Sequence, residues 1–215
     1  MPRTRARPTL ENALRRFGFV RVAGADEVGR GCLAGPVVAA AVVLAPARPI
    51  PGLADSKLLS PAARERLAPR IKSDAVAWAL GEVSPADIDR INIHQASLEA
   101  MRRAILALVP QPDMVLVDGF PIPGLEMAQR AVIGGDRLCS AIAAASIVAK
   151  VYRDALMVHL HAEDSRYGYD RHKGYATPDH LAALARYGYS PIHRRSFRPA
   201  SLFDTIDTTA PGTDD

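Results

Sequence analysis

The sequence predicts an α/β protein whose strands carry acidic side chains to one edge of a sheet. Three apolar, strand-like runs each reach an aspartate with a glycine nearby, at residues 19–26, 114–118 and 131–136. Apolar residues at helical spacing lie between these runs, as in residues 92–108. Because ligands of open α/β sheets bind beyond the carboxyl ends of the strands, we expect the aspartates to form one site.

The composition fits one globular domain with a modest positive charge. The chain has 215 residues, of which 48% are hydrophobic, so it can bury a full core. A net charge of +4 and a pI near 9.3 favour a polyanionic partner without proving one. Cys32 and Cys139 offer no disulfide framework, and we expect a reducing, cytoplasmic setting. The apolar run at residues 37–44 is too short to span a membrane.

The chain divides into a body and two polar ends. Residues 1–7 contain three arginines and are interpreted as a flexible basic arm. Residues 8–204 are expected to form a single domain. Residues 205–215 carry no apolar stripe and are interpreted as a disordered tail.

Asp26 and Glu27 follow the first strand, which is expected over residues 17–25, and a second strand is expected over residues 36–44. Adjacent side chains on a straight strand point to opposite faces, so we expect the glycine-rich segment at 29–35 to bend the chain after Asp26. Both carboxylates could then share one ion, and their hard oxygens suit Mg²⁺ or Mn²⁺. The alternative is a capping acid and a loop acid around an ordinary turn.

The middle of the chain alternates helices and strands. The proline-rich residues 45–57 are interpreted as a solvated loop. Ser60-Pro61 predicts the start of a helix of about a dozen residues, and residues 75–83 predict a strand. A short helix is expected from Ser84, and a further helix is expected to begin at Asn92 with a capping-box-like start.

The third apolar run leads into a long helix that is expected over residues 138–161. Its first half is rich in alanine, and small side chains let a helix lie close on a sheet. Asp154 near its end is either an ordinary surface residue or a member of the acid cluster, and the sequence leaves both interpretations open.

The segment at residues 165–198 mixes cations with aromatic rings. Such a mixture can hold a phosphate backbone and stack on sugars or bases, although a solvated face with core aromatics would account for about half of these residues. The residues concerned are Arg166, Arg171, Lys173, Arg186, Arg194, Arg195 and Arg198, with Tyr167, Tyr169, Tyr175, Tyr187, Tyr189 and Phe197.

Several ordered motifs resemble the type 2 ribonucleases H, the family of bacterial ribonuclease HII, over roughly residues 18–203. They are Ala-Gly-Ala-Asp-Glu-Val-Gly-Arg-Gly at 23–31, Leu-Ala-Gly-Pro at 33–36, Asp-Ser-Lys at 55–57, Val-Asp-Gly at 117–119, Gly-Asp at 135–136, Ala-Ala-Ala-Ser-Ile-Val-Ala-Lys-Val at 143–151, His-Lys-Gly-Tyr at 172–175 and Ser-Pro-Ile-His-Arg-Arg-Ser-Phe at 190–197. The order of the whole set is specific, whereas Asp-Gly or Gly-Asp alone would carry no information.

The resemblance implies an RNase H-like fold, which is a mixed five-stranded sheet flanked by helices with a helical C-terminal portion. It implies a two-metal site with Mg²⁺ or Mn²⁺, whose catalytic and metal-binding acids are Asp26, Glu27, Asp118 and Asp136, with Asp154 as a further metal ligand. Two such ions roughly 4 Å apart can hold the attacking water and the leaving 3′ oxygen in line.

The resemblance also implies the substrate and the residues that contact it. The expected activity is cleavage of the RNA strand of RNA/DNA hybrids and nicking of DNA 5′ of embedded ribonucleotides, leaving 3′-hydroxyl and 5′-phosphate ends. The family's Gly-Arg-Gly loop reads the 2′-hydroxyl, and its tyrosine packs at the junction between RNA and DNA. The implied substrate-binding residues are Gly29, Arg30, Gly31, Lys57, Ser146, Lys150, Lys173, Tyr175, His193 and Arg194.

Two positions depart from the family pattern. Lysines often stand where this sequence has Gly134 and Leu138, and Arg137 is a candidate substitute. We expect a monomer that needs no membrane, and the sequence leaves contact with a replication clamp unknown. A DNA-only nuclease of the same fold, a non-catalytic binding module and a small-molecule phosphate enzyme are the alternatives. The Gly-Arg-Gly loop argues against the DNA-only nuclease. The aligned acids argue against the binding module, and the tyrosine-rich basic segment argues against the small-molecule enzyme.

Overall fold

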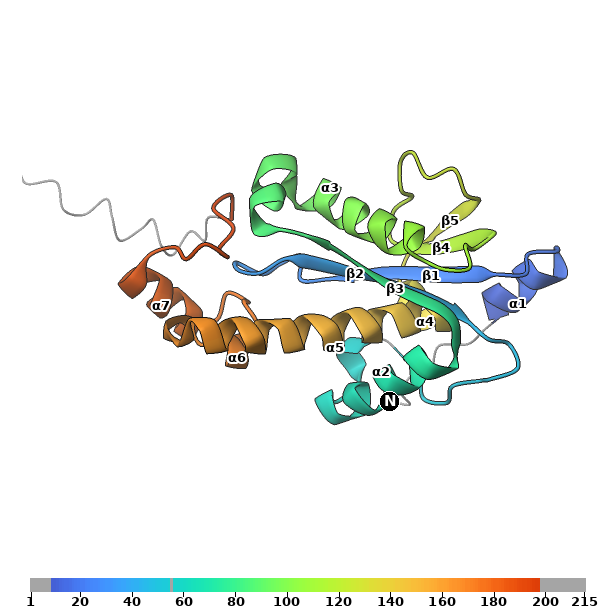
Figure 1. Ribbon diagram of the computed structural model, residues 1–215, viewed down its shortest axis with the longest axis horizontal. Helices are drawn as coiled ribbons and strands as arrows, with labels where there is room; N and C mark the ends of the chain where they lie inside the picture. The colour runs from blue at the N-terminus through green and yellow to red at the C-terminus, as the bar shows by residue number, and fades with distance from the viewer. Residues whose placement is uncertain (1–8, 55, 198–215) are drawn as a thin grey trace, which may run out of the picture.

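The computed structural model describes residues 9–54 and 56–197 (Figure 1). The expected basic arm at 1–7 and the expected tail at 205–215 lie outside the described residues. The helices and strands are α1 (Thr9–Arg16), β1 (Val22–Val28), β2 (Val37–Leu44), α2 (Pro61–Asp74), β3 (Ala75–Val83), α3 (Pro85–Leu106), β4 (Met114–Asp118), β5 (Gln129–Val132), α4 (Gly135–Leu138), α5 (Ser140–Glu163), α6 (Tyr169–His172) and α7 (Pro178–Tyr187). Short 3₁₀ helices span Ser56–Leu58 and Ser165–Tyr167.

The sheet is mixed and has five strands in the order β3-β2-β1-β4-β5, which confirms the expected fold class. β1 pairs antiparallel with β2 and parallel with β4, and β4 pairs parallel with β5. The register joins Ala25 to Val117, so Asp26 and Asp118 come next at neighbouring positions. Parallel pairing therefore brings the ends of two acidic runs together.

The limits of two strands differ from the sequence prediction. β1 begins at Val22 rather than at residue 17. β1 does not stop at Ala25 but continues through Asp26 and Glu27 to Val28, because β2 extends its ladder with Ala39 and Ala40 as partners. The third apolar run is a strand only as far as Val132, and the following aspartate lies in α4. Partner strands, which the local sequence does not show, set both ends.

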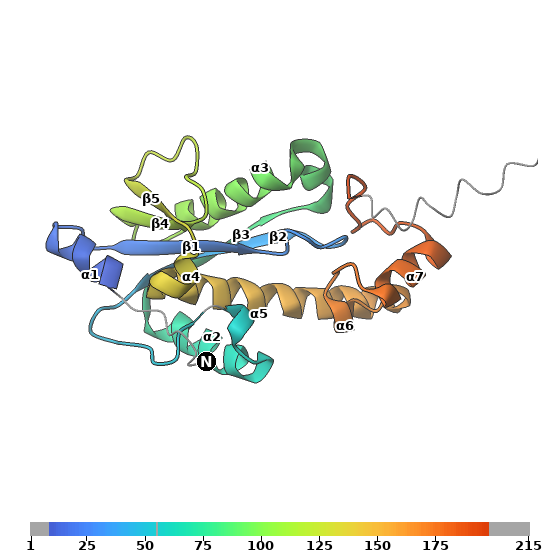
Figure 2. The ribbon, with the colours of Figure 1, turned by 180° about the vertical axis from the view of Figure 1, so that it is seen from behind.

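Helices cover both faces of the sheet, with α3 on one side and α5 and α2 on the other (Figures 1 and 2). The small residues of α5 allow the close approach that the sequence predicts. A Cβ atom added at Gly24 in β1 would lie 2.2 Å from the main chain of Ala141. In the part of the chain that the structure describes, no helix is long and apolar enough to cross a membrane.

The predicted helix starts are confirmed at three positions. Ser60 Oγ accepts a hydrogen bond from Ala63 N at 3.3 Å, and Ser84 Oγ accepts one from Asp87 N at 3.1 Å. Asn92 Oδ1 accepts from the main-chain N–H groups of residues 94 and 95, as a cap would. The two helices predicted to meet at Asn92 are both present within α3, and a kink separates them at Asn92, whose backbone is not helical (φ 65°, ψ 163°).

The helical C-terminal portion, with α6 and α7, lies at the far end of α5 (Figures 1 and 2). Two completely buried arginines attach the loop at residues 29–36 to this region. Arg153 donates to Ala34 O and Pro36 O at 3.0 Å each and to the carbonyl of residue 173 at 2.9 Å. Arg194 donates to main-chain carbonyls of residues 30 and 35. The loop is therefore held from two sides.

Candidate active site

Four acidic side chains predicted from the sequence line one cavity of about 240 Å³. Asp26 and Glu27 come from β1, Asp118 is the last residue of β4, and Asp136 lies in α4. Although adjacent side chains leave a strand on opposite sides, both acids of β1 reach the cavity. The structure thus brings together all four acids that the sequence analysis singled out.

Asp26 is the most buried of the four acids, with 6% of its surface exposed. Burial raises the pKa of Asp26 well above its usual value, and the charges of Glu27 and Asp118 raise it further. Burial also raises the pKa of Glu27. Arg30 opposes that rise, because its Nη1 lies 3.3 Å from Glu27 Oε1. These carboxylates repel one another, and a cation between them would relieve the repulsion.

Hydrogen bonds hold two of the carboxylates in place. Asp26 Oδ1 accepts from Glu27 N at 2.8 Å, and Asp118 Oδ1 accepts from Gly135 N at 2.7 Å. The second bond ties the end of β4 to the first turn of α4, which carries Asp136. The main chain therefore fixes the spacing between the strand ends.

The acids offer the hard oxygen donors that divalent cations prefer. Within the described residues, no three His, Cys, Asp or Glu side chains are grouped so that they could hold one ion together. The chemistry of the donors fits Mg²⁺ or Mn²⁺, but any such ion would need oxygen ligands from outside the protein as well. The two-metal site therefore stays a prediction.

Basic and hydroxyl side chains also line the cavity. Lys57, Lys150 and Ser146 line it as predicted, and Ser56 lines it too. Ser146 Oγ lies 2.8 Å from Ser56 Oγ and also hydrogen-bonds Asp26. The segment at 45–57 was interpreted as a solvated loop, but it is buried at Ser56, whose hydroxyl pairs with that of Ser146.

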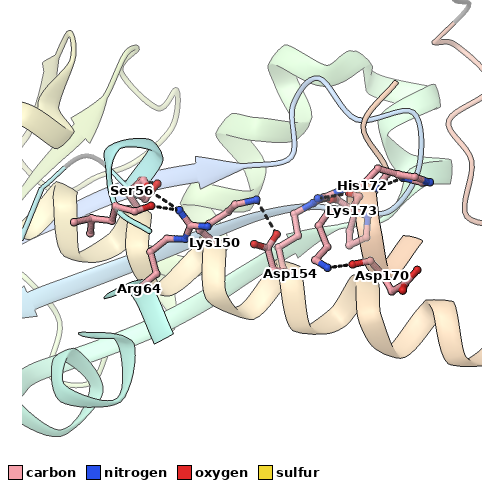
Figure 3. A network of polar contacts seen from close by, with 12 residues as sticks. Ser56, Arg64, Lys150, Asp154, Asp170, His172 and Lys173 are labelled. Carbon is pink, nitrogen blue, oxygen red and sulfur yellow. Dashed lines mark hydrogen bonds and ion pairs between the residues drawn. The ribbon is translucent and has the colours of Figure 1, made fainter. Parts of the chain in front are cut away.

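Lys150 and Asp154 lie one helical turn apart on α5, and Lys150 Nζ donates to Asp154 Oδ1 at 2.7 Å (Figure 3). Asp154 is not among the described residues that line the cavity, while its partner Lys150 is. Asp154 therefore contacts a residue of the cavity lining without lining the cavity itself.

The predicted recognition residues border the same cavity. Gly29, Arg30 and Gly31 line it, as does Tyr175. Of the whole surface of Tyr175, 39% is exposed. Tyr175 forms an isolated bridge with Cys32, and Lys150 Nζ lies 5.6 Å from the centre of its ring. An exposed ring at the edge of the acid cavity can contact a sugar, which a core ring could not.

Three other predicted contact residues lie elsewhere. His193 and Arg194 are buried, with 3% and 0% of their surfaces exposed, so neither presents surface to a duplex. Lys173 Nζ donates to the carbonyl of Asp170 (Figure 3). Sequence patterns of charge alone do not distinguish a cation that binds phosphate from one that ties loops together.

The departures from the family pattern have plain structural consequences. Gly134 precedes α4 in the left-handed conformation (φ 64°, ψ 38°), and Leu138 is 55% exposed. Neither residue supplies a charge, and Arg137 is exposed without lining the acid cavity. Lys57 and Lys150 are the lysines that line the cavity among the described residues.

Residues 23–200 match the family model described as Ribonuclease HII. A ribonuclease HII of Pelotomaculum thermopropionicum is 55% identical over 191 residues, which cover 88% of this chain and 72% of that protein. A crystal structure of the ribonuclease H2 from Pyrococcus horikoshii covers 88% of this chain and 100% of that one, with 26% identity and a TM-score of 0.73. An RNase HII of Archaeoglobus fulgidus, solved in a complex with PCNA, covers 86% and 100%, with 26% identity and a TM-score of 0.70.

The mixed sheet and the carboxylates at its parallel strand ends define an enzyme with the ribonuclease H fold. Within that class, the chain belongs to the ribonuclease HII family. It is an endoribonuclease that acts on RNA/DNA hybrids, and its family is metal-dependent.

Proposed function

We propose that this enzyme cleaves the RNA strand of hybrids and also nicks duplex DNA on the 5′ side of an embedded ribonucleotide. The proposal rests on one cavity that combines four acids, the Gly29–Gly31 loop and an exposed tyrosine. The acids serve hydrolysis of a phosphodiester, and the loop and ring serve recognition of the sugar next to it. The products are a 3′-hydroxyl and a 5′-phosphate.

We assign Asp26, Glu27, Asp118 and Asp136 to binding Mg²⁺ or Mn²⁺. Mg²⁺ is usually bound by one or two carboxylates together with water and substrate phosphate, so it does not require three protein ligands at one point. Bound ions would supply charge neutralisation at the phosphate and a lower pKa for the attacking water. Asp154 can join them only if Lys150 releases it, and we propose this further ligand on that condition.

The chain's own groups perform the recognition. Only the 2′-hydroxyl distinguishes ribose from deoxyribose at a given site, and fixed main-chain donors and acceptors can detect it. A Cβ at Gly31 would meet nothing within 4 Å, so this stretch of main chain is open to a sugar. We propose that Tyr175 packs on the neighbouring deoxyribose, while Lys57 and Lys150 attract the phosphates on either side. No histidine lines the cavity among the described residues, so we assign no general base from the protein.

A duplex with one embedded ribonucleotide tests the proposal directly. The labelled duplex is incubated with the enzyme in Mg²⁺, in Mn²⁺ or with a chelator, and the cut position is mapped. We expect one cut on the 5′ side of the ribonucleotide with either metal and none with the chelator. A cut in the matched DNA-only duplex would instead favour a DNA nuclease of the same fold, and a cut on the 3′ side would refute the assigned junction.

We further propose that the enzyme acts as a monomer in the cytoplasm. The acids, the recognition loop and the tyrosine all come from one chain, and both cysteines are free and buried, as a reducing compartment allows. Light scattering coupled to size-exclusion chromatography would test the first point, and a dimer mass at assay concentration would contradict it.

A further inference from the structure

Three histidines form a buried group behind the tyrosine that borders the active site. His172 comes from α6, His180 from α7 and His193 from the segment after α7, and at most 8% of each is exposed. The rings of His172 and His180 stack with centroids 4.3 Å apart. His172 and His193 belong to motifs noticed in the sequence and His180 does not, and none of these rings lines the acid cavity.

Main-chain groups fix which nitrogen of each ring carries the proton. Ser190 N donates to His193 Nδ1 at 2.9 Å, so the proton of neutral His193 is on Nε2. That Nε2 lies 3.1 Å from His180 Nε2, which must therefore accept. The proton of His180 is then on Nδ1, which donates to the carbonyl of Tyr175 at 2.9 Å. The result is a hydrogen-bond chain with a single direction, from Ser190 to Tyr175.

The chain requires both imidazoles to be neutral. A proton added to His193 Nδ1 would face the N–H of Ser190, and one added to His180 Nε2 would face the N–H of His193. Burial lowers the pKa of His180 and of His193 to about 4. Both rings are therefore neutral at ordinary pH, and the direction of the chain is maintained.

His172 anchors Gly174, the residue that precedes Tyr175. Its Nδ1 accepts from Gly174 N at 3.2 Å, and its Nε2 donates to Tyr167 O at 2.7 Å. Gly174 O in turn accepts from Leu33 N at 2.8 Å. The main chain of Gly174 and Tyr175 is thus hydrogen-bonded to His172 and His180 and to Leu33 in the loop at residues 29–36.

We propose that the chain from Ser190 through His193 and His180 positions Tyr175, and that it thereby sets the preference for a single embedded ribonucleotide over a continuous hybrid. The inference rests on the proposed junction role of Tyr175. In this arrangement His180 is a positioning residue, because it touches the tyrosine's main chain and no substrate. A purely structural role would predict instead that any loss of the imidazole lowers both activities equally.

Two replacements of His180 separate these possibilities. The amide nitrogen of His180→Asn can occupy the place of Nδ1 and still donate to the Tyr175 carbonyl, while losing the bond to His193. The amide of His180→Gln reaches the place of Nε2 and keeps the bond to His193, while losing the donor to Tyr175. Both variants remove the same ring from the core, so each is the packing control for the other.

The experiment compares kcat/KM for a duplex with one ribonucleotide with kcat/KM for a continuous RNA/DNA hybrid, in the full chain with Mg²⁺. We expect His180→Gln to lower the ratio of the two at least tenfold and His180→Asn to keep it within threefold of wild type. Equal ratios in the two variants would overturn the inference. Should either fail to fold, His193→Gln keeps the donor to His180 and His193→Asn removes it, so only the second should lower the ratio.

Tyr175→Ala distinguishes failure of the inference from failure of the proposed function. If Tyr175→Ala lowers the ratio and the histidine pair does not, the positioning chain is wrong while the junction role stands. If Tyr175→Ala leaves the ratio unchanged, the junction role fails and the inference fails with it. Nitrogen-15 shifts provide a check without activity, since His180 must carry its proton on Nδ1 and His193 on Nε2; the reverse assignment would overturn the chain.

Discussion

Replacing Gly31 by alanine should leave the fold intact and damage cleavage. Gly31 does not have the left-handed conformation that favours glycine, and an added Cβ would meet nothing within 4 Å. By the entropy of the unfolded chain alone, Gly31→Ala should raise stability by about 0.4–1 kcal/mol. At about 2–4 °C per kcal/mol for a chain of this size, Tm should be unchanged or slightly higher. Folding therefore gives no reason for glycine here, and approach of a ligand does.

Gly29→Ala is the matched control, since it should damage the fold itself. Gly29 has φ +92°, where a side chain costs about 1–2 kcal/mol. Its Cβ would also lie 2.2 Å from Arg153 Nε, and moving that buried guanidinium would break bonds to carbonyls at about 1–3 kcal/mol each. We expect a loss of at least about 3 kcal/mol, or a fall in Tm of at least about 6 °C.

The assay is steady-state cleavage of a duplex with one ribonucleotide, measured beside thermal melting of each variant. A methyl group at position 31 would occupy the space through which a sugar approaches the main chain. We expect kcat/KM for Gly31→Ala to fall at least about tenfold, which corresponds to about 1.4 kcal/mol of lost transition-state binding. Activity within twofold of wild type, with Tm unchanged, would refute the role of this main chain in recognition.

Four further outcomes test other parts of the molecule. Asp118→Asn should abolish cleavage and leave hybrid binding equal or tighter, and cleavage within tenfold of wild type would remove Asp118 from the site. Deleting residues 205–215 should change Tm little, because that segment has no apolar stripe to bury; a large fall would contradict this. Asp154→Asn should reduce cleavage less than Asp118→Asn does, because Lys150 already pairs with Asp154; an equal loss would place Asp154 among the essential ligands. Because the pKa values of His180 and His193 are lowered to about 4, the unfolded chain binds more protons than the folded chain between pH 6.5 and about 4. The contribution of these rings to the free energy of unfolding is therefore complete above pH 6.5. As pH falls below 6.5, it is lost at up to about 1.4 kcal/mol per pH unit for each ring. The raised pKa values of Asp26 and Glu27 act in the opposite direction. The test therefore compares the slope of unfolding free energy against pH in wild type and in His193→Gln, and identical slopes would contradict the prediction.

The positions of the four acids could be predicted because each lies where an apolar run ends. Asp118 illustrates the reason: a continuous run of buried residues identifies a central strand, and the first polar residue marks its end. The end of β1 could not be predicted in this way. The ladder between β1 and β2 continues through Glu27 to Val28. The residues of β2 that extend this ladder follow in the chain only after the loop at residues 29–36.

Local hydrogen bonding was predictable where it depends on neighbours in the chain. Asn92 was identified as a cap because the amides it accepts from are two and three residues away. The sequence could not show the positive φ of 65° that Asn92 adopts where the two helices of α3 meet. The histidine chain is a different case, since its direction depends on ring nitrogens of residues 13 positions apart and on two main-chain groups.

The two buried arginines show why the recognition loop could not be built from sequence. Arg153 and Arg194 donate to main-chain carbonyls, and every residue has a carbonyl, so the sequence contains no partner to identify. The choice of partner also has an electrostatic consequence. A carbonyl accepts the hydrogen bonds of a guanidinium without cancelling its charge, whereas a carboxylate would neutralise it. The charges of both arginines act on Cys32 within the loop, where they oppose the rise in the pKa of its thiol. The residues that fix the shape of the loop therefore also place positive charge beside it, and that charge would attract a phosphate backbone whose sugar reaches Gly31.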